Sequence, residues 1–413
     1  MVIKLENTSK DYKTTDLGDI PQSWNVYRLD ELASKILDGT HATPTYVETG
    51  IKFLSVENIT KNDYVNTKYV TLDAHKEYSK RCKVEKDDIL MTRIGSIGNA
   101  KLVDWDFESS IYVSLALIKL KNKKQAKYIS HYMKSDIFKK EILKRSLLNA
   151  APMKINLGEV GKVAVILPSL EEQQKIAEIL SATDEQIEKT EQLIKKTKEL
   201  KKGLMQQLLI KGIGHTEFKQ TELGEIPIEW EIVKQGNIAT FFNGRAYKQT
   251  EFTESGTQII RIQNLTGGKN YVYSDMELDA NKYAEKDDLI YAWSATFGPY
   301  IWKGPRSIYH YHIWKIEVDE NLLDKYFFFY RLDYISVEMH SQKNGSAFAH
   351  LTKGGMENHA IPLPPLNEQK RIAEILLSVD EQIEIYEKEK EKQIELKRAL
   401  MQKLLTGKLR VTV

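Results

Sequence analysis

The sequence has few of the residues that build disulfide frameworks, metal clusters or membrane spans. Its 413 residues include one cysteine, Cys82, which excludes an intramolecular disulfide and a cysteine-based metal cluster. It contains no apolar run of about 18 residues or more, and its first residues lack the apolar core of a signal peptide. The formal charge is +2 although 29% of the residues are charged, so any surface that binds nucleic acid must be local. We therefore expect a cytoplasmic protein without a membrane segment.

Motifs that carry common enzymatic chemistry are also missing. GxxxxGK[ST], GxGxxG after a strand, [DN]PP[YF], HExxH and GxSxG do not occur. Arg81 and Lys83 flank Cys82 and could lower the pKa of its thiol, but a lone cysteine is more often structural. His310 and His312 would share one side of a strand in IYHYHIW, yet no third metal ligand at a familiar spacing accompanies them, and a half-buried aromatic strand is the simpler interpretation. The sequence thus favours a binding role over a catalytic one.

What the chain does contain is a long internal repeat. LPSLEEQQKIAEILSATDEQI begins at Leu167, and LPPLNEQKRIAEILLSVDEQI begins at Leu363. The pairing of Leu167–Leu209 with Leu363–Leu405 gives 25 identities over 43 positions, and LGDIPQSW at Leu17 is echoed by LGEIPIEW at Leu223. The chain therefore consists of two tandem halves.

The segments between these anchors diverge but share a skeleton. ETGIKFLSVENIT corresponds to ESGTQIIRIQNLT, KDDILMTRIGSIG to KDDLIYAWSATFG, and SIYVS at Ser110 to SIYHY at Ser307. These words are short β-branched and aromatic runs bounded by Gly, Asn and Asp, and helical patches lie between them. We predict one α+β fold used twice with different surface residues.

The repeated segments predict two long helices. Apolar and small residues recur at spacings of four and three, which is a heptad seam with a polar centre. The positions expected to pair the helices are Ile176, Leu180, Ile187, Leu204, Leu208, Ile372, Leu376, Ile383, Leu400 and Leu404. Each helix would be about 60 Å long, so the simplest arrangement is an antiparallel coiled coil with a pseudo-two-fold internal repeat. The alternative is that each helix folds back onto its own domain.

Two similar domains with different surfaces suit the recognition of two different short DNA sequences. Polar, Gly-bearing loops at equivalent points of both halves are the candidate contacts to base edges, and Lys119–Arg145 is a basic run suited to phosphates or to a solvated helix face. The candidate residues of the first half are Thr40, His41, Thr43, Asn58, Arg93, Ser96, Asn99 and Lys154. Those of the second half are Arg245, Tyr247, Lys248, Gln249, Arg261, Gln263, Asn264, Trp293, Ser294, Thr296, His310, His312, Ser346 and His350.

The doubled LPxLxEQxxIAEIL…DEQI followed by LKxxLMQxLL, each behind a domain that opens with LGxIPxxW, resembles the specificity (S) subunit of type I restriction–modification systems. The resemblance covers nearly the whole chain. It implies two target recognition domains, residues 1–166 and 214–362, and two spacer helices, residues 167–213 and 363–413. The domains would each read half of a bipartite, asymmetric site on double-stranded DNA.

The resemblance also implies partners. Two methyltransferase (modification) subunits would dock on the helices, and restriction/translocase subunits would join that core. No cofactor is expected in this chain, because AdoMet, ATP and Mg²⁺ would belong to the partners. The leading hypothesis is a non-catalytic DNA-recognition subunit, and the alternative is a coiled-coil scaffold whose end domains bind proteins. Replacing the seam residues Lys390 and Lys397 with Leu is expected to tighten helix pairing.

Overall fold

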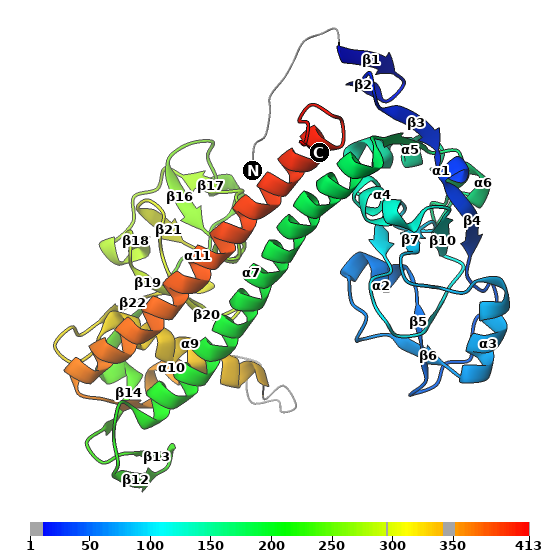
Figure 1. Ribbon diagram of the computed structural model, residues 1–413. Helices are drawn as coiled ribbons and strands as arrows, with labels where there is room; N and C mark the ends of the chain where they lie inside the picture. The colour runs from blue at the N-terminus through cyan, green and yellow to red at the C-terminus, as the bar shows by residue number, and fades with distance from the viewer. Residues whose placement is uncertain (1–10, 295, 342–351, 413) are drawn as a thin grey trace. The chain divides into compact units, whose positions relative to one another are not determined.

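A computed structural model describes residues 11–294, 296–341 and 352–412, without the side chains of residues 340 and 341. It divides into two compact units (Figure 1). The first unit comprises residues 1–190 and 389–413, and the second unit comprises residues 191–388. Both long helices, α7 (Leu170–Lys211) and α11 (Leu366–Leu404), contribute one part to each unit. Among the described residues, no helix combines the length and the hydropathy that a membrane crossing needs.

The first unit is built from short strands and short helices. Its strands are β1 (Tyr12–Thr15), β2 (Gly18–Pro21), β3 (Asn25–Arg28), β4 (Ala33–Asp38), β5 (Ile51–Leu54), β6 (Lys68–Val70), β7 (Ile89–Thr92), β8 (Ala100–Leu102), β9 (Ser109–Ile111), β10 (Leu115–Leu120) and β11 (Ala164–Leu167). Its helices are α1 (Leu29–Leu32), α2 (Val56–Lys61), α3 (Leu72–Arg81), η2 (Lys123–Gln125, a 3₁₀ helix), α4 (Ala126–Tyr132), α5 (Asp136–Lys144) and α6 (Leu157–Gly161).

The second unit repeats this order with small changes. Its strands are β12 (Phe218–Thr221), β13 (Gly224–Pro227), β14 (Glu231–Lys234), β15 (Ala239–Asn243), β16 (Thr257–Ile260), β17 (Val272–Ser274), β18 (Tyr283–Ala284), β19 (Leu289–Ala292), β20 (Gly298–Ile301), β21 (Ser307–Tyr309), β22 (Ile313–Val318) and β23 (Ala360–Leu363). Its helices are α8 (Ile262–Leu265), α9 (Lys325–Ser341) and α10 (Lys353–Asn358), with 3₁₀ helices η3 (Gln235–Asn237), η4 (Gln249–Glu251) and η5 (Ala280–Lys282).

The sheets of the two units have matching topologies. A four-stranded antiparallel sheet has the order β4-β10-β7-β8 in the first unit and β15-β22-β19-β20 in the second. A smaller sheet has the order β6-β5-β9 or β17-β16-β21-β18, and its parallel pair is β5–β9 or β16–β21. The prediction of one α+β fold used twice is confirmed.

The inner strands β7 and β19 of the four-stranded sheets are buried on both faces. In β7, Ile89 and Met91 join a core with α4, α5 and α7, whereas Leu90 between them joins a separate cluster with β5. β19 repeats the pattern, with Leu289 in the helix-side core and Ile290 in the cluster beside β16. Because side chains alternate along a strand, burial on both faces explains why these strands read as unbroken apolar runs.

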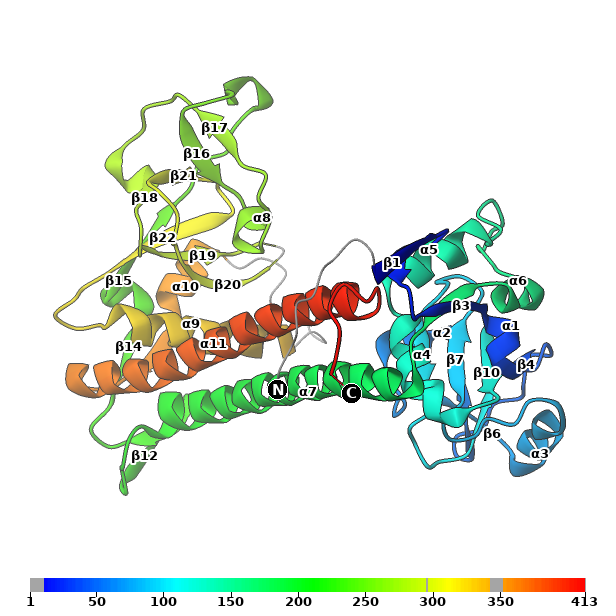
Figure 2. The same cartoon turned by 45° about the horizontal axis from the view of Figure 1, so that its top comes forward.

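The two long helices pair antiparallel in each unit (Figures 1 and 2). In the first unit, Lys397 of α11 forms an ion pair with Asp184 of α7. In the second, Lys201 of α7 lies 2.8 Å from Asp380 of α11. These are the same two positions of the repeated segment with the helices exchanged, so the repeat encodes its own pairing contact. The alternative, in which each helix packs only on its own domain, is wrong.

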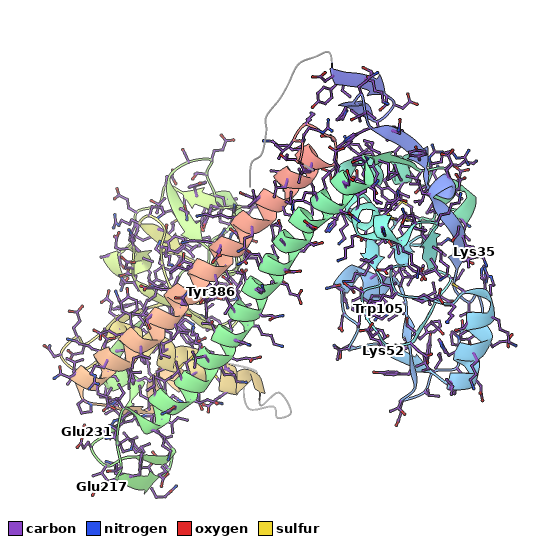
Figure 3. All side chains as sticks on the ribbon, in the orientation of Figure 1. Lys35, Lys52, Trp105, Glu217, Glu231 and Tyr386 are labelled. Carbon is purple, nitrogen blue, oxygen red and sulfur yellow. The ribbon has the colours of Figure 1, made fainter. Side chains whose placement is uncertain are left out.

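The seam between the helices is apolar at its ends and polar at its centre. All ten residues expected to pair the helices are buried or half-buried. At the centre, Thr190 donates from Oγ1 to Oε1 of Gln393 at 3.1 Å, and the half-buried Tyr386 of α11 occupies the place that Thr190 has in α7 (Figure 3). The expected tightening by Lys397→Leu is not supported, because Lys397 is already paired with a seam carboxylate.

A tryptophan from an LGxIPxxW segment contacts the first turn of each long helix. Trp24 donates from Nε1 to Glu172 of α7 at 3.0 Å, and Arg410, which follows α11, donates to the same carboxylate at 2.7 Å. Trp230 donates to Glu368 of α11 at 3.0 Å, and the segment after α7 reaches that carboxylate through a backbone N–H and a histidine. In each unit, the LGxIPxxW segment is therefore in direct contact with the start of a long helix. The glutamate in that contact also binds the segment that follows the opposite helix.

Candidate nucleic-acid interface

In both units the loop after the first strand of the large sheet crosses closely over the backbone of the smaller sheet. The crossing residue is Gly39 after β4 and Gly244 after β15. A Cβ on Gly39 would lie 1.9 Å from the carbonyl oxygen of Ile111, and one on Gly244 would lie 2.2 Å from that of His310. Only glycine allows this approach, which fixes where the loop emerges.

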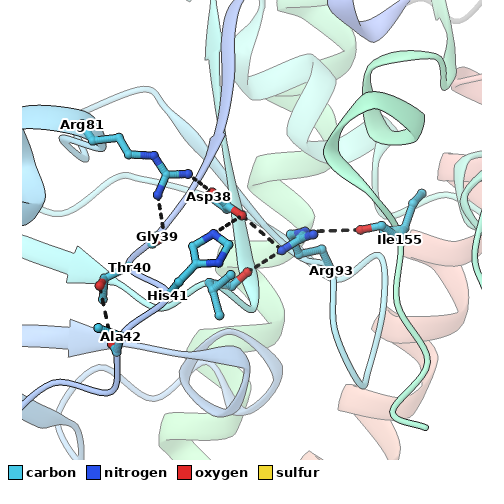
Figure 4. A network of polar contacts seen from close by, with 9 residues as sticks. Asp38, Gly39, Thr40, His41, Ala42, Arg81, Arg93 and Ile155 are labelled. Atoms are coloured by element: carbon cyan, nitrogen blue, oxygen red, sulfur yellow. Dashed lines mark hydrogen bonds and ion pairs between the residues drawn. The ribbon is translucent and has the colours of Figure 1, made fainter. Parts of the chain in front are cut away.

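In the first unit a buried carboxylate organises the loops. Asp38 at the end of β4 receives Nη1 of Arg93 at 3.3 Å, Nε2 of His41 at 3.1 Å, and a close ion pair from Arg81 of α3 (Figure 4). The Arg93 side chain, 10% exposed, also donates to the carbonyl oxygens of Val113 at 2.8 Å and Ile155 at 3.2 Å. Arg93 thereby ties three segments to one carboxylate, with its Nε and Nη1 donors used inside the fold.

Backbone hydrogen bonds bring two further predicted loops to the same place. The N–H of Gly95 donates to the carbonyl oxygen of Met153 at 2.8 Å, and that of Ile155 donates to Arg93 at 2.9 Å. Three loops, residues 38–46, 93–99 and 149–156, hold all the candidate residues of the first half except Asn58, and these contacts bring the three loops together on one face.

The candidate side chains of the first unit fall into two groups. Those with exposed side chains are His41, Thr43, Ser96 and Lys154, with Thr40 and Asn99 half-buried beside them. Asn58 is buried instead: its Oδ1 accepts from the N–H of Ser55 at 2.9 Å, and its Nδ2 donates to Asp63 at 3.0 Å. This amide stabilises the start of α2.

The second unit places aromatic rings where the first has the arginine. Trp293 stands at the position of Arg93: its N–H donates to His312 at 3.0 Å, as that of Arg93 donates to Ser114 at 2.9 Å. The indole Nε1 of Trp293 donates to the carbonyl oxygen of Tyr311 at 2.8 Å. Ring centroids lie 3.8 Å apart for Tyr311 and His312, and 5.3 Å apart for Trp293 and His312. This surface is aromatic, with Tyr311 exposed at its edge.

Burial lowers the pKa of His310, with further lowering from His312 and Arg261, and burial also lowers the pKa of His312. Both imidazoles are therefore neutral at pH 7, so each ring carries one donor and one acceptor nitrogen. The two histidines therefore add no positive charge to this face. Arg245 is half-buried and paired with Glu251 at 2.6 Å, which raises the pKa of the arginine.

The remaining candidates of the second unit also separate by burial. Exposed are Lys248, Gln249, Gln263 and Thr296, and half-buried are Tyr247, Arg261 and Ser294. Asn264 is buried at the start of α8, where its Oδ1 accepts from the N–H of Arg261 at 3.0 Å and its Nδ2 donates to Gly268 at 3.1 Å. Ser346 and His350 lie outside the described residues.

Two sequence interpretations need correction. IYHYHIW is not one strand, because β21 ends at Tyr309 and the chain turns at residues 311 and 312 before β22. The pairing of SIYVS with SIYHY is also shifted by one residue: Phe53 of β5 faces Ser110, whereas Ile259, at the same place in β16, faces Ile308. Ser110 therefore corresponds to Ile308, and His312 to Ser114. Among the described residues, no group of three His, Cys, Asp or Glu side chains is placed to hold a metal ion.

Sequence reasoning missed Arg81, which lies beside the loop face with about half of its side chain exposed. The available signal was the pair of basic residues that flanks Cys82, Arg81 and Lys83. Cys82 is buried, and burial raises the pKa of its thiol to about 11, so the cysteine is structural and Arg81 belongs to the face. Tyr311, between the two histidines, was likewise missed.

Comparisons with known proteins agree with this architecture. Residues 21–199 and 227–396 each match the type I restriction modification DNA specificity domain. The type I restriction enzyme MjaX specificity subunit of Methanocaldococcus jannaschii is 32% identical over 429 aligned positions, which cover 100% of both chains. The crystal structure of the type I restriction-modification S subunit from M. genitalium superposes with a TM-score of 0.60 at 17% identity, over 92% of this chain and 96% of that one. A chain from a study of complex assembly and conformational transition in the type I R-M system gives 0.59 at 18% identity, over 94% and 99%.

Proposed function

This chain belongs to the family of type I restriction–modification DNA specificity subunits, and we propose that its two units each read one half of a bipartite, asymmetric sequence on double-stranded DNA. One observation carries the proposal. The two units present loops at the same points of the same sheet topology, yet the side chains at those points differ in chemical type. A constant frame with variable donors and acceptors is what two different half-sites require.

The first half-site would be read by hydrogen-bonding groups on loops that are held by the charged network around Asp38. His41, Ser96 and Asn99 offer donors and acceptors for base edges, and Lys154 and Arg81 offer cations for phosphates. Support comes from the convergence of the three loops and from the exposed side chains of His41, Ser96 and Lys154. Arg93 would position these loops, since it is buried and its Nε and Nη1 donors are used inside the fold.

The second half-site would be read by amides and aromatic groups. Gln249 and Gln263 are exposed amides suited to adenine, and the exposed ring of Tyr311 would suit apolar contact with the methyl group of thymine. Lys248 is an exposed cation of this face. We exclude Asn58 and Asn264 from the contact set because their amides cap helices.

The repeated helices would dock two methyltransferase subunits. Leu200 of α7 and Leu396 of α11 occupy the same position of the repeat and are 55% and 56% exposed. Equal apolar residues at equivalent, exposed positions suit two copies of one partner. This chain would act without catalysis of its own, with AdoMet, ATP and Mg²⁺ carried by the methyltransferase and restriction/translocase partners on DNA in the cytoplasm.

Selection from a random duplex pool tests the proposal. The full chain is mixed with the pool with and without its methyltransferase partner, and bound duplexes are sequenced. We expect a bipartite sequence whose two halves are separated by unspecified bases. No enriched bipartite sequence in either condition would contradict the proposal, and enrichment of a single continuous site would assign reading to one unit alone.

A further inference from the structure

A groove in the first unit runs between the beginning of α5 and the last three turns of α11. Its volume is about 400 Å³, within the range of sites that accept several side chains. The groove lies within one unit, between the recognition domain and the helix pair. It is separate from the loop face around Asp38.

The groove carries a strong positive charge. Lys139 and Lys140 of α5 and Arg398 and Lys408 on the side of α11 line it, and none of the four forms an ion pair with any residue that the structure describes. Asp136 is the single carboxylate among the groove's lining residues. Unneutralised cations on opposite walls attract a ligand that brings carboxylates to both sides.

A further lysine lines the groove. Lys134, at the corner between α4 and α5, lines it and forms no ion pair with any described residue. Burial lowers the pKa of Lys134, although the carboxylate of Asp184 opposes this. Asp184 is itself occupied by Lys397. A carboxylate from outside would therefore give Lys134 the partner that it lacks within the unit.

The groove also has apolar walls. Ile137 of α5, Ile394 and Met401 of α11, and Leu405 directly after α11 line it, and Ile394 is 38% exposed. A nucleic-acid backbone offers phosphates but no aliphatic groups to such a surface. An amphipathic helix offers both, with apolar residues at spacings of three and four and acids beside them.

The second unit does not repeat this arrangement. The helix side is similar, since Lys202 and Met205 of α7 match Arg398 and Met401 of α11. The domain side differs, because α9 has no lysine after Lys325 and carries Glu338 near its end. The same acidic ligand would be repelled there.

We propose that this groove, formed by residues 134–140 and 394–408 and here called the α5–α11 groove, binds an acidic amphipathic helix of a partner protein, one per chain. The inference rests on the proposed function in one respect, that the chain works in a multi-subunit complex. The two equivalent docking surfaces on α7 and α11 would then be joined by one additional site that only the first unit provides. The two methyltransferase subunits would therefore lie in inequivalent environments.

A synthetic helix tests the proposal. The probe is a blocked peptide of about 20 residues with Leu at spacings of three and four and Glu on both sides, labelled with a fluorophore and titrated with the full chain. We expect one bound peptide per chain, weaker binding as salt rises from about 0.05 M to 0.5 M, and no binding of the peptide with Gln in place of Glu. Lys139→Glu with Lys140→Glu should weaken binding at least about tenfold, and Ile394→Asn about fivefold.

The matched control is Lys35→Glu with Lys76→Glu, which changes the net charge equally on exposed lysines of β4 and α3 (Figure 3 labels Lys35). It should leave peptide affinity within about twofold. Equal weakening by both double variants, or two peptides per chain, would overturn the proposal. So would loss of duplex binding, but not of peptide binding, in the groove variant, which would assign the groove to phosphate. Duplex selection is measured separately, so failure of DNA reading with intact peptide binding would contradict the proposed function and leave the groove standing.

Discussion

The two recognition faces share a frame and differ in what holds them. Both emerge where a glycine crosses the smaller sheet, and both place the loop that follows β7 or β19 beside the chain turn that precedes β10 or β22. In the first unit a buried carboxylate with two arginines and a histidine joins the loops. In the second, stacked rings from Tyr291, Trp314 and Trp293 lead from the core to the surface. Backbone contacts therefore set the position of a loop, and side chains are left to set its chemistry.

The shared frame is broken most severely at its glycines. Gly39→Ala and Gly244→Ala would each drive a Cβ into a backbone carbonyl oxygen, and we expect each to destabilise its unit by more than about 3 kcal/mol. Gly203→Ala is the control, since open space surrounds that helical glycine and the change should stabilise α7 by up to about 1 kcal/mol. Chemical denaturation measures all three. A cost below that of an ordinary surface change at either crossing would refute the shared frame.

The difference between the faces is sharpest at the Arg93 and Trp293 positions. Arg93→Met leaves the buried Asp38 with only its more exposed partners, so we expect a loss of about 3 kcal/mol. Trp293→Met should cost less, because Trp293 is half-buried and no carboxylate depends on it. Thermal unfolding of both variants provides the test. Equal losses would show that the charged and aromatic arrangements hold their loops in the same way.

The junction between helix pair and domain predicts a difference in acid sensitivity. In the first unit His131 lies 3.9 Å from Asp184, whereas in the second Tyr330 donates to Asp380 at 2.7 Å. Burial lowers the pKa of His131 from 6.5 to about 4, and Lys134 adds to the lowering. The neutral imidazole therefore stabilises the fold above pH 6.5, and that stability is lost as the pH falls toward 4.

His131→Gln removes this titration, so the variant should lose less stability than the parent chain between pH 6.5 and pH 4. Tyr330→Phe is the matched change in the second unit. It should lower stability by a similar amount at both pH values, since burial and Asp380 raise the pKa of Tyr330 far above this range. Unfolding curves at the two pH values decide, and identical pH profiles for the parent chain and His131→Gln would rule out the assignment.

The smallest expected effect concerns the seam lysines. Lys397→Leu and Lys201→Leu each leave a half-exposed aspartate without its partner in the opposite helix, and we expect each to lower stability by about 1 kcal/mol or less. The heptad pattern alone predicts the opposite sign. Denaturation in low and high salt distinguishes them: an ion pair loses its contribution in high salt, whereas an apolar gain in the Leu variants would persist.

Much of the architecture could be predicted because the repeat records contacts. Trp24 and Glu172 both belong to repeated words, and they hydrogen-bond to each other. The KDD segment of each half likewise forms the same kind of turn. Asp87 and Asp287 have φ values of 66° and 71°, and the aspartate that follows each of them accepts a backbone N–H. A local contact that both units require is therefore encoded by the same residues in both halves.

The loop faces could be predicted only in outline. A sequence identifies polar loop residues, but burial decides whether an amide caps a helix, as Asn58 does, or is free for DNA. The strand register also could not be predicted where the sequences of the two halves diverge. The pairing of β9 with β5 and the pairing of β21 with β16 differ by one residue. Arg81 was missed because it reaches the face from α3, outside the three loops.

The central claim is that the two units read separate half-sites, and a loop exchange tests it most directly. Residues 243–252 are replaced by the corresponding loop of a relative with another target, and the methylated sequence is determined in cells that contain the methyltransferase partner. We predict that one half of the bipartite target changes while the other half stays as in the parent chain. A change in both halves, or in neither, would contradict the account.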